Sequence, residues 1–117
     1  MIIGIIGSRR RNTFEDYELV ERAFIPFIST ENSIVSGGCP QGGDRFAEII
    51  AKKYNISIKI HLAEWNKYGK SAGFKRNIFI AQDADVLIAC VALNRKGGTE
   101  DTINKYIKLN KDHLILC

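Results

Sequence analysis

Residues 33–44 read Ser-Ile-Val-Ser-Gly-Gly-Cys-Pro-Gln-Gly-Gly-Asp. A short apolar run here enters a loop with four glycines in seven positions, and a helical pattern containing Phe46 and Ile50 follows at once. Glycines permit positive φ values and expose backbone N–H groups, while the positive end of the following helix points at whatever the loop encloses. The stretch therefore predicts a strand, a loop that fits phosphate or ribose oxygens, and a helix. A purely structural tight turn is the alternative interpretation.

The same alternation of apolar runs, turns and helical stretches extends to both sides of residues 33–44. Five short runs rich in Ile and Val are predicted as strands, and all but the third are expected to be buried on both faces. Apolar residues three or four positions apart predict four helices between the strands. The predicted strands are Ile2–Ile6, Ser33–Ser36, Ile56–Leu62, Asp85–Val91 and His113–Leu116.

Each predicted helix has one apolar face that is expected to pack on the sheet. In the first helix Pro26 cannot donate a hydrogen bond to the carbonyl of Arg22, which predicts a kink or an early end. The second helix is predicted at about 44–54, the third at about 73–83, and the fourth after Thr99. The residues expected to face the core are Val20, Ala23, Phe24, Phe27, Ile28, Phe46, Ile49, Ile50, Phe74, Ile78, Ala81, Ile103, Tyr106 and Ile107.

Strands that alternate with helices pair in parallel, because each helix carries the chain back across the sheet. Right-handed crossovers place helices on both faces and leave a crevice at the carboxyl ends of the strands, where the strand order reverses. The sequence thus predicts an α/β fold with three layers, α/β/α, and a five-stranded, mostly parallel sheet. A chain of 117 residues has room for one hydrophobic core, so we expect a single domain over residues 1–117.

The composition narrows the classes of function. Hydrophobic and charged fractions of 45% and 26% are ordinary for a globular protein, and the apolar start is far shorter than a membrane span, so we expect a cytoplasmic protein without a membrane partner. Three scattered cysteines and two isolated histidines predict reduced thiols and neither a metal nor a cofactor. The net charge of +4 favours anionic partners but is too modest to make nucleic acid the expected one.

Two loops at the start of the chain have residues that suit phosphate. After the first strand come Gly7, Ser8 and Arg9, which combine close backbone access, a hydroxyl donor and paired guanidinium donors. Two more arginines follow, and because three in a row cannot all point into one site, a solvated basic loop remains the alternative. In the glycine-rich loop, Asp44 is either the N-cap of the next helix or an acceptor for a ribose hydroxyl.

Two later loops add aromatic and cationic candidates. Trp65 and Tyr68 offer flat faces for a base, and Lys70 and Arg76 place positive charge near the start of the third helix. Trp65 as a core residue is the alternative interpretation. After the fourth strand, the segment 97–99 reads Gly-Gly-Thr and predicts a second phosphate cradle opposite the first, with Thr99 as a plain N-cap as its alternative.

In this order and spacing, the motifs resemble the YspA/cpYpsA-related SLOG family over almost the whole chain. The resemblance implies a Rossmann-like fold, a bacterial or phage protein, a nucleotide-derived ligand and a homo-oligomer. The residues that carry it are Gly7-Ser8-Arg9, Ser36-Gly37-Gly38 with Gly42 and Asp44, Trp65, Tyr68-Gly69-Lys70, Ala72-Gly73, Arg76-Asn77 and Gly97-Gly98-Thr99.

The wider superfamily implies two alternative functions. Its phosphoribohydrolases cleave a base from ribose phosphate, but their catalytic glutamate corresponds here to Thr102, which leaves Asp44 as the one catalytic candidate. Its DNA-processing protein A branch binds single-stranded DNA, for which basic loop residues and stacking aromatic rings would serve. We expect instead a protein that senses or sequesters a phosphate-bearing, nucleotide-derived small molecule at the carboxyl edge of the sheet. The predicted ligand-binding residues are Gly7, Ser8, Arg9, Ser36, Gly37, Gly38, Gly42, Asp44, Trp65, Tyr68, Lys70, Gly73, Arg76, Asn77, Gly97, Gly98 and Thr99.

Overall fold

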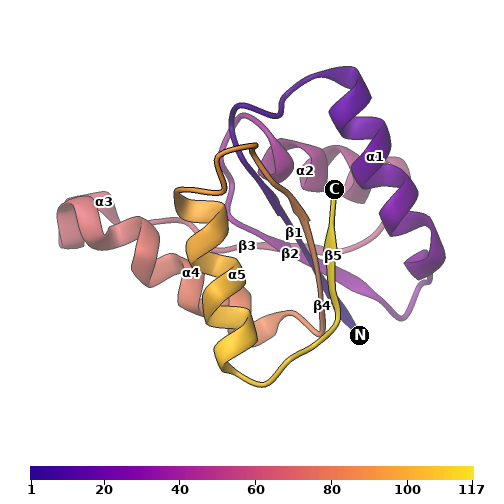
Figure 1. The fold of residues 1–117 in the computed structure, drawn as a ribbon. Coiled ribbons are helices and arrows are strands. Elements are labelled where there is room, and N and C mark those ends of the chain that lie inside the picture. Colours follow the sequence, from indigo (N-terminus) through magenta and orange to yellow (C-terminus); the bar gives the residue numbers. More distant parts are fainter.

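Strand β1 (Ile2–Gly7) is the centre of the fold, and its four middle residues are buried. In the computed structural model, which describes residues 1–117, β1 pairs in parallel with β2 (Ser33–Ser36) and with β4 (Val86–Cys90). Strands β3 (Ile58–Ile60) and β5 (Leu114–Leu116) form the two edges, which gives the order β3-β2-β1-β4-β5 (Figure 1). The predicted five-stranded α/β fold is confirmed, and the sheet is parallel throughout, as in Rossmann-like folds.

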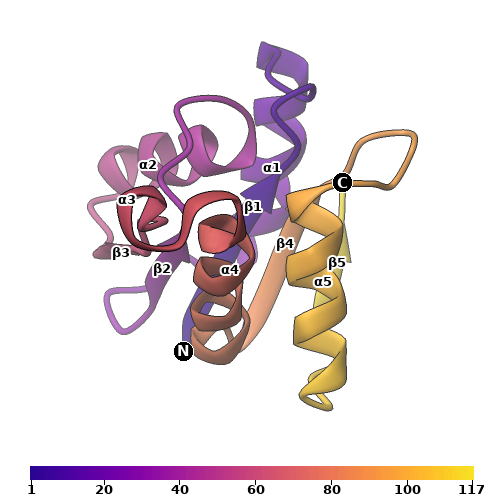
Figure 2. The same cartoon turned by 90° about the vertical axis from the view of Figure 1, so that its left-hand side faces the viewer.

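Four long helices cover the two faces of the sheet, as predicted. Helices α1 (Phe14–Phe24) and α2 (Gly43–Lys53) lie on one face, and α4 (Ala72–Asp83) and α5 (Gly98–Lys108) lie on the other (Figure 2). A single-turn helix that was not predicted, α3 (Trp65–Tyr68), stands out from the rest of the molecule in Figure 1. None of these helices combines the length and the apolar character that crossing a bilayer requires.

Helix α1 shows how local sequence sets an element's ends. It begins at a capping box in which Thr13 accepts from the backbone of Asp16 and the Asp16 carboxylate accepts from the backbone of Thr13. It ends at Phe24, and Pro26 lies in a 3-10 turn at Ile25–Phe27, which confirms the predicted early end. Because the chain leaves the helix there, Ile28 does not continue the apolar face and is exposed, contrary to prediction.

Two apolar clusters hold the layers together. The cluster beneath α1 and α2 includes Phe24, Phe46 and Ile50, and the cluster beneath α4 and α5 includes Ile80 and Tyr106. Four further residues predicted for the core are exposed instead, namely Ile49, Phe74, Ile78 and Ile107.

The face of α4 explains two of those errors. Its buried residues are Ala72, Asn77, Ile80 and Ala81, so the inward stripe includes a polar residue and is rotated away from Phe74 and Ile78.

The edge position of β5 explains why this strand is less buried than predicted, because one side of an outer strand has no neighbour. Its residues are only partly covered rather than buried on both faces.

The start of α2 crosses the carboxyl end of β1 in direct backbone contact. A Cβ atom added to Gly43 would overlap the carbonyl group of Ile6 and the backbone nitrogen of Gly7. One added to the preceding residue, Gly42, would overlap the carbonyl of Ser8, and Gly42 also has a φ of +73°. Glycine is therefore required at both positions for packing, and Gly42, which was predicted to give a ligand access to the backbone, does not line the cavity described below.

The substitution Gly43→Ala tests this contact. We expect it to lower the free energy of unfolding by about 3 kcal/mol or more, since backbone atoms on both sides cannot move aside. Gly98→Ala is the matched control, because it also adds one methyl to the first residue of a helix but meets nothing closer than 3.9 Å. Urea unfolding of both variants measures the difference, and equal stabilities would contradict the tight crossing.

Candidate functional site

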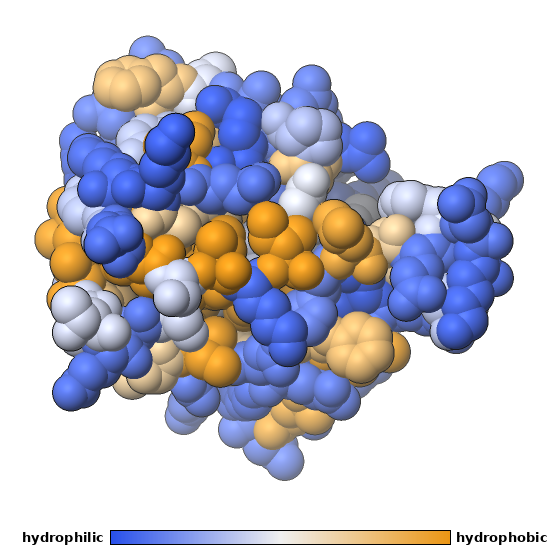
Figure 3. Space-filling model, turned by 180° about the vertical axis from the view of Figure 1, so that it is seen from behind, coloured by the Kyte–Doolittle hydropathy of each residue, from blue (hydrophilic) through white to orange (hydrophobic).

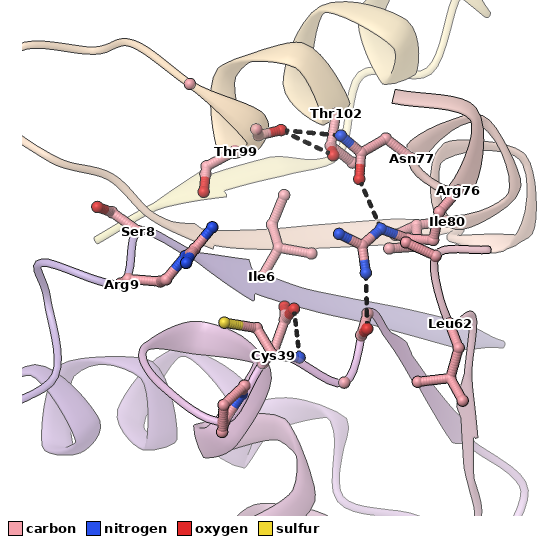
Figure 4. Close-up of a pocket in the computed structure, with 18 of the residues that line it drawn as sticks. Ile6, Ser8, Arg9, Cys39, Leu62, Arg76, Asn77, Ile80, Thr99 and Thr102 are labelled. Carbon is pink, nitrogen blue, oxygen red and sulfur yellow. Dashed lines mark hydrogen bonds between the residues drawn. The ribbon is translucent and has the colours of Figure 1, made fainter. Parts of the chain in front are cut away.

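A cavity of about 620 Å³ opens at the carboxyl ends of the strands. It lies where the strand order reverses, because the chain leaves β1 toward α1 on one face and leaves β4 toward α5 on the other. Figure 4 shows side chains from the loops after β1, β2 and β3 and from helices α4 and α5 converging on this space. The lining residues are Ile6, Gly7, Ser8, Arg9, Arg10, Gly37, Gly38, Cys39, Pro40, Asp44, Leu62, Ala63, Trp65, Arg76, Asn77, Ile80, Lys96, Gly97, Gly98, Thr99 and Thr102.

The three consecutive arginines after β1 take three different directions. Arg9 makes no hydrogen bond to the protein, and its guanidinium group points into the cavity (Figure 4). Arg10 lines the cavity but donates from Nη2 to the side chain of Asn94 at 2.8 Å. Arg11 turns away and pairs with Asp16 at 2.6 Å, which raises the pKa of Arg11. Arg9 is consequently the one guanidinium of the three that is entirely free for a ligand.

Arg76 on α4 is held in a fixed position at the wall of the cavity opposite Arg9. Its Nη1 donates to the carbonyl of Gly37 at 2.6 Å, and its Nε donates to the Asn77 side chain at 3.0 Å. A Cβ atom at Gly37 would lie 2.5 Å from Nη1, so glycine makes room for this contact. The remaining nitrogen, Nη2, has no partner in the protein and is left for a ligand.

Helix α4 also anchors the start of α5 through two buried polar side chains. Asn77 donates to the carbonyl of Gly98 at 3.2 Å and to the carboxylate of Asp101 at 3.1 Å. Thr102 donates its hydroxyl to the same carbonyl at 3.1 Å. The first turn of α5 is thus fixed relative to Arg76.

The first turn of α5 presents unpaired donors. Gly97, with a φ of +103°, is the N-cap and provides no side chain to cap the helix, so the N–H groups of Gly98 and Thr99 have no acceptor in the protein. Thr99 lies inside the helix and not at the N-cap as the alternative interpretation held, and its hydroxyl faces the cavity (Figure 4). The two acidic residues of this turn do not line the cavity, because Glu100 pairs with Arg95 and Asp101 pairs with Lys105.

Asp44 is the one carboxylate that lines the cavity. It is not an N-cap, since Gly42 holds that position; instead its two oxygens accept from the Ser36 hydroxyl at 3.0 Å and from the N–H of Cys39 at 3.1 Å. Burial raises the pKa of Asp44, while these two hydrogen bonds and the charge of Arg76 act in the opposite direction. The carboxyl group therefore holds the glycine-rich loop in shape and is shielded from water.

The structure brings most of the predicted ligand-binding residues together around one cavity. Those that line it are Gly7, Ser8, Arg9, Gly37, Gly38, Asp44, Trp65, Arg76, Asn77, Gly97, Gly98 and Thr99. Ser36 lies beneath the loop, where its single hydroxyl proton is shared between the Ile5 carbonyl, at 2.5 Å, and the Asp44 carboxylate. Tyr68 and Lys70 do not line the cavity, because α3 and the turn after it carry the chain outward, and Gly73, in the first turn of α4, does not line it either.

Sequence reasoning missed part of the lining. Lys96 and Arg10 directly adjoin predicted motifs, and their charge was an available signal. Ile6, Leu62 and Ile80 gave no signal, because an apolar residue at the end of a strand or on a helix looks like a core residue. Trp65 was left open, and with 57% of its surface exposed it lies at the cavity rim and not in the core.

Comparison with known proteins identifies the fold. No protein-family model and no curated protein matches the chain, so the resemblance to the SLOG family depends on the motifs alone. The structure is similar to that of a molybdenum cofactor binding protein from the phototrophic bacterium Rippkaea orientalis, with a TM-score of 0.76 and 24% sequence identity. The match covers 98% of this chain and 74% of that protein.

The buried carboxyl group of Asp44 makes stability depend on pH. Because its pKa is raised in the folded state, the ionised form destabilises the fold, and this cost appears as the pH rises from the usual Asp range through the raised pKa. Asp44→Asn removes the titration, so the variant's free energy of unfolding should increase relative to that of the wild type across this window and then stay level. Urea unfolding at successive pH values measures the difference. A difference that shrinks as the pH rises would mean that the hydrogen bonds outweigh burial.

Proposed function

We propose that this protein binds a phosphate-bearing, nucleotide-type small molecule in the cavity at the carboxyl edge of its sheet. The observation that carries the proposal is the convergence of four basic side chains and a row of unpaired backbone donors on one space. A volume of about 620 Å³ lies in the usual range for small-molecule sites. The basic residues are Arg9, Arg10, Arg76 and Lys96, against the single buried carboxyl group of Asp44.

In this proposal the phosphate lies at the start of α5. The free N–H groups of Gly98 and Thr99 and the hydroxyl of Thr99 act as donors, and the helix dipole adds to their attraction for an anion. Arg9 has unused guanidinium donors that match phosphate oxygens in pairs. The fixed amide of Asn77 keeps this turn in place, so little ordering is needed when the ligand binds.

The remainder of the ligand extends toward the opposite side of the cavity. Ile6, Leu62 and Ile80 provide apolar surface there, and Trp65 at the rim is available to stack on a ring. The free Nη2 of Arg76 and the carboxyl group of Asp44 provide polar contacts for ribose hydroxyls or ring atoms. This division into a cationic end and an apolar end is typical of sites for nucleotide-type molecules.

Two kinds of similarity support the proposal. The motifs resemble those of the SLOG family, to which we propose that the chain belongs, and the fold is shared with a protein that binds molybdenum cofactor. Molybdenum cofactor is therefore a candidate ligand alongside the nucleotides, and it belongs in any binding screen of this protein.

We favour sensing or sequestering over hydrolysis. Both oxygens of Asp44 already accept hydrogen bonds, and no second carboxylate lines the cavity to activate water. The related hydrolase function predicts cleaved product after incubation with the ligand, whereas the binding function predicts that the ligand is recovered intact. Chromatography of the bound fraction separates the two.

Arg9→Ala tests the proposed phosphate contact. We would measure affinity by isothermal titration against AMP, ADP-ribose, NAD, cyclic dinucleotides, molybdenum cofactor and a short oligodeoxynucleotide. For the ligand that binds best, Arg9→Ala should reduce affinity roughly 10- to 150-fold, which corresponds to about 1.5 to 3 kcal/mol for a hydrogen-bonded charge. Stability without ligand should not change, because Arg9 has no partner in the protein.

Arg22→Ala is the control for the change in net charge. Arg22 is exposed on α1, makes no hydrogen bond and does not line the cavity, so its removal should leave affinity within about twofold. Equal losses in both variants would show that the charge acts at long range and would remove Arg9 from the site. Binding of the oligodeoxynucleotide alone would replace the proposal with the single-stranded DNA function.

A further inference from the structure

The outer edge of β3 is open. In the parallel ladder the N–H of His61 donates to Ser36, and the carbonyl of Ser57 accepts from Ile34. Residues alternate in the direction of their backbone groups, so the N–H and C=O groups of Ile58 and Ile60 face away from β2. No strand, helix or loop pairs with them. This edge has free donors and acceptors at strand spacing.

A second, smaller cavity of about 180 Å³ lies beside this edge. Its walls include Ile60, Leu62 and Tyr68, together with Phe79, which stacks on His61 with ring centroids 5.6 Å apart. Leu62 has 71% of its surface exposed and Phe79 has 53%. Figure 3, which views the molecule from behind, shows apolar side chains gathered in a band across this side. The edge is therefore bordered by a hollow that fits one side chain.

Positive charge is concentrated around the same edge. Residues 58–76 contain five of the seventeen basic residues and one of the thirteen acidic ones, so the rest of the chain has twelve of each and is neutral. Arg76 lines both cavities. The other four are exposed lysines, and two of them, Lys67 and Lys75, lie over the ring of Tyr68. This segment therefore carries the excess positive charge of the chain, and one acidic residue from outside it, Asp83, lies 3.9 Å from Lys59.

We propose that the β3 edge, Ile58–Leu62, binds an extended acidic segment of a partner protein as an added sixth strand. The free backbone groups would hydrogen-bond the segment, the small cavity would take one of its apolar side chains, and the lysines would pair with its carboxylates. A nucleic acid has no backbone donors at strand spacing, so it would leave the edge groups unused. A second copy of this chain would bring like charges together, because each copy contributes the same lysines.

The test is an NMR titration of the full-length chain with the peptide acetyl-Glu-Val-Glu-Val-Glu-Val-Glu-amide. We expect amide shifts confined to residues 58–62, 67–68 and 75–79, and affinity that falls at least tenfold when Lys replaces Glu in the peptide. Methylation of alternate peptide nitrogens, which removes donors along one edge, should abolish binding. No shifts, or shifts confined to the larger cavity, would overturn the proposal.

Two variants separate strand addition from simple charge attraction. Ile60→Pro removes an outward N–H without breaking the ladder to β2, so the spectrum should show the native fold while peptide binding is lost. Lys75→Glu should weaken peptide binding several-fold, whereas Lys108→Glu, at the far end of α5, should not. Peptide binding that persists in Ile60→Pro would overturn the added strand. Self-association that Ile60→Pro prevents, or an oligothymidine that binds this edge more tightly than the peptide, would assign the edge to a different occupant.

Discussion

The fold and the site both depend on one backbone contact, the crossing of the α2 start over the carboxyl end of β1. Gly42 and Gly43 make it possible, because any side chain there would overlap the backbone of Ile6, Gly7 or Ser8. The contact fixes the glycine-rich loop beneath the first basic loop and brings Asp44 into the wall of the cavity. The glycines that resemble a ligand-binding signature in the sequence are in part a packing requirement.

Most of the arginines around the cavity use their donors in hydrogen bonds to other parts of the protein. Arg10, Arg11 and Arg76 all hold loops or helices in place, and Arg10 and Arg76, which line the cavity, each retain guanidinium nitrogens without a protein partner. Arg9 and the first turn of α5 remain without protein partners. In the proposed function, anion recognition is thus concentrated on two unpaired groups that rigid neighbours support. Such preorganised donors suit a small charged ligand, because they lose little freedom on binding.

Local sequence signals made most of the fold and much of the candidate site predictable. The Ile/Val runs, the glycine loops and Pro26 fix strands and helix ends through short-range physics, and they were read correctly. The face of α4 was misjudged because Asn77 is buried by a tertiary hydrogen bond to α5, which no binary pattern contains. Tyr68 and Lys70 were assigned to the cavity because the single turn of α3, which turns the chain outward, has too few residues to show a periodicity.

The central claim is that the start of α5 binds the phosphate of a small molecule. The most direct measurement is a crystal structure of the protein with its tightest nucleotide-type ligand. Our account predicts the phosphate within hydrogen-bond distance of the N–H groups of Gly98 and Thr99, with the guanidinium of Arg9 against it. A ligand whose phosphate lies away from α5, or that binds outside the cavity, would contradict the account.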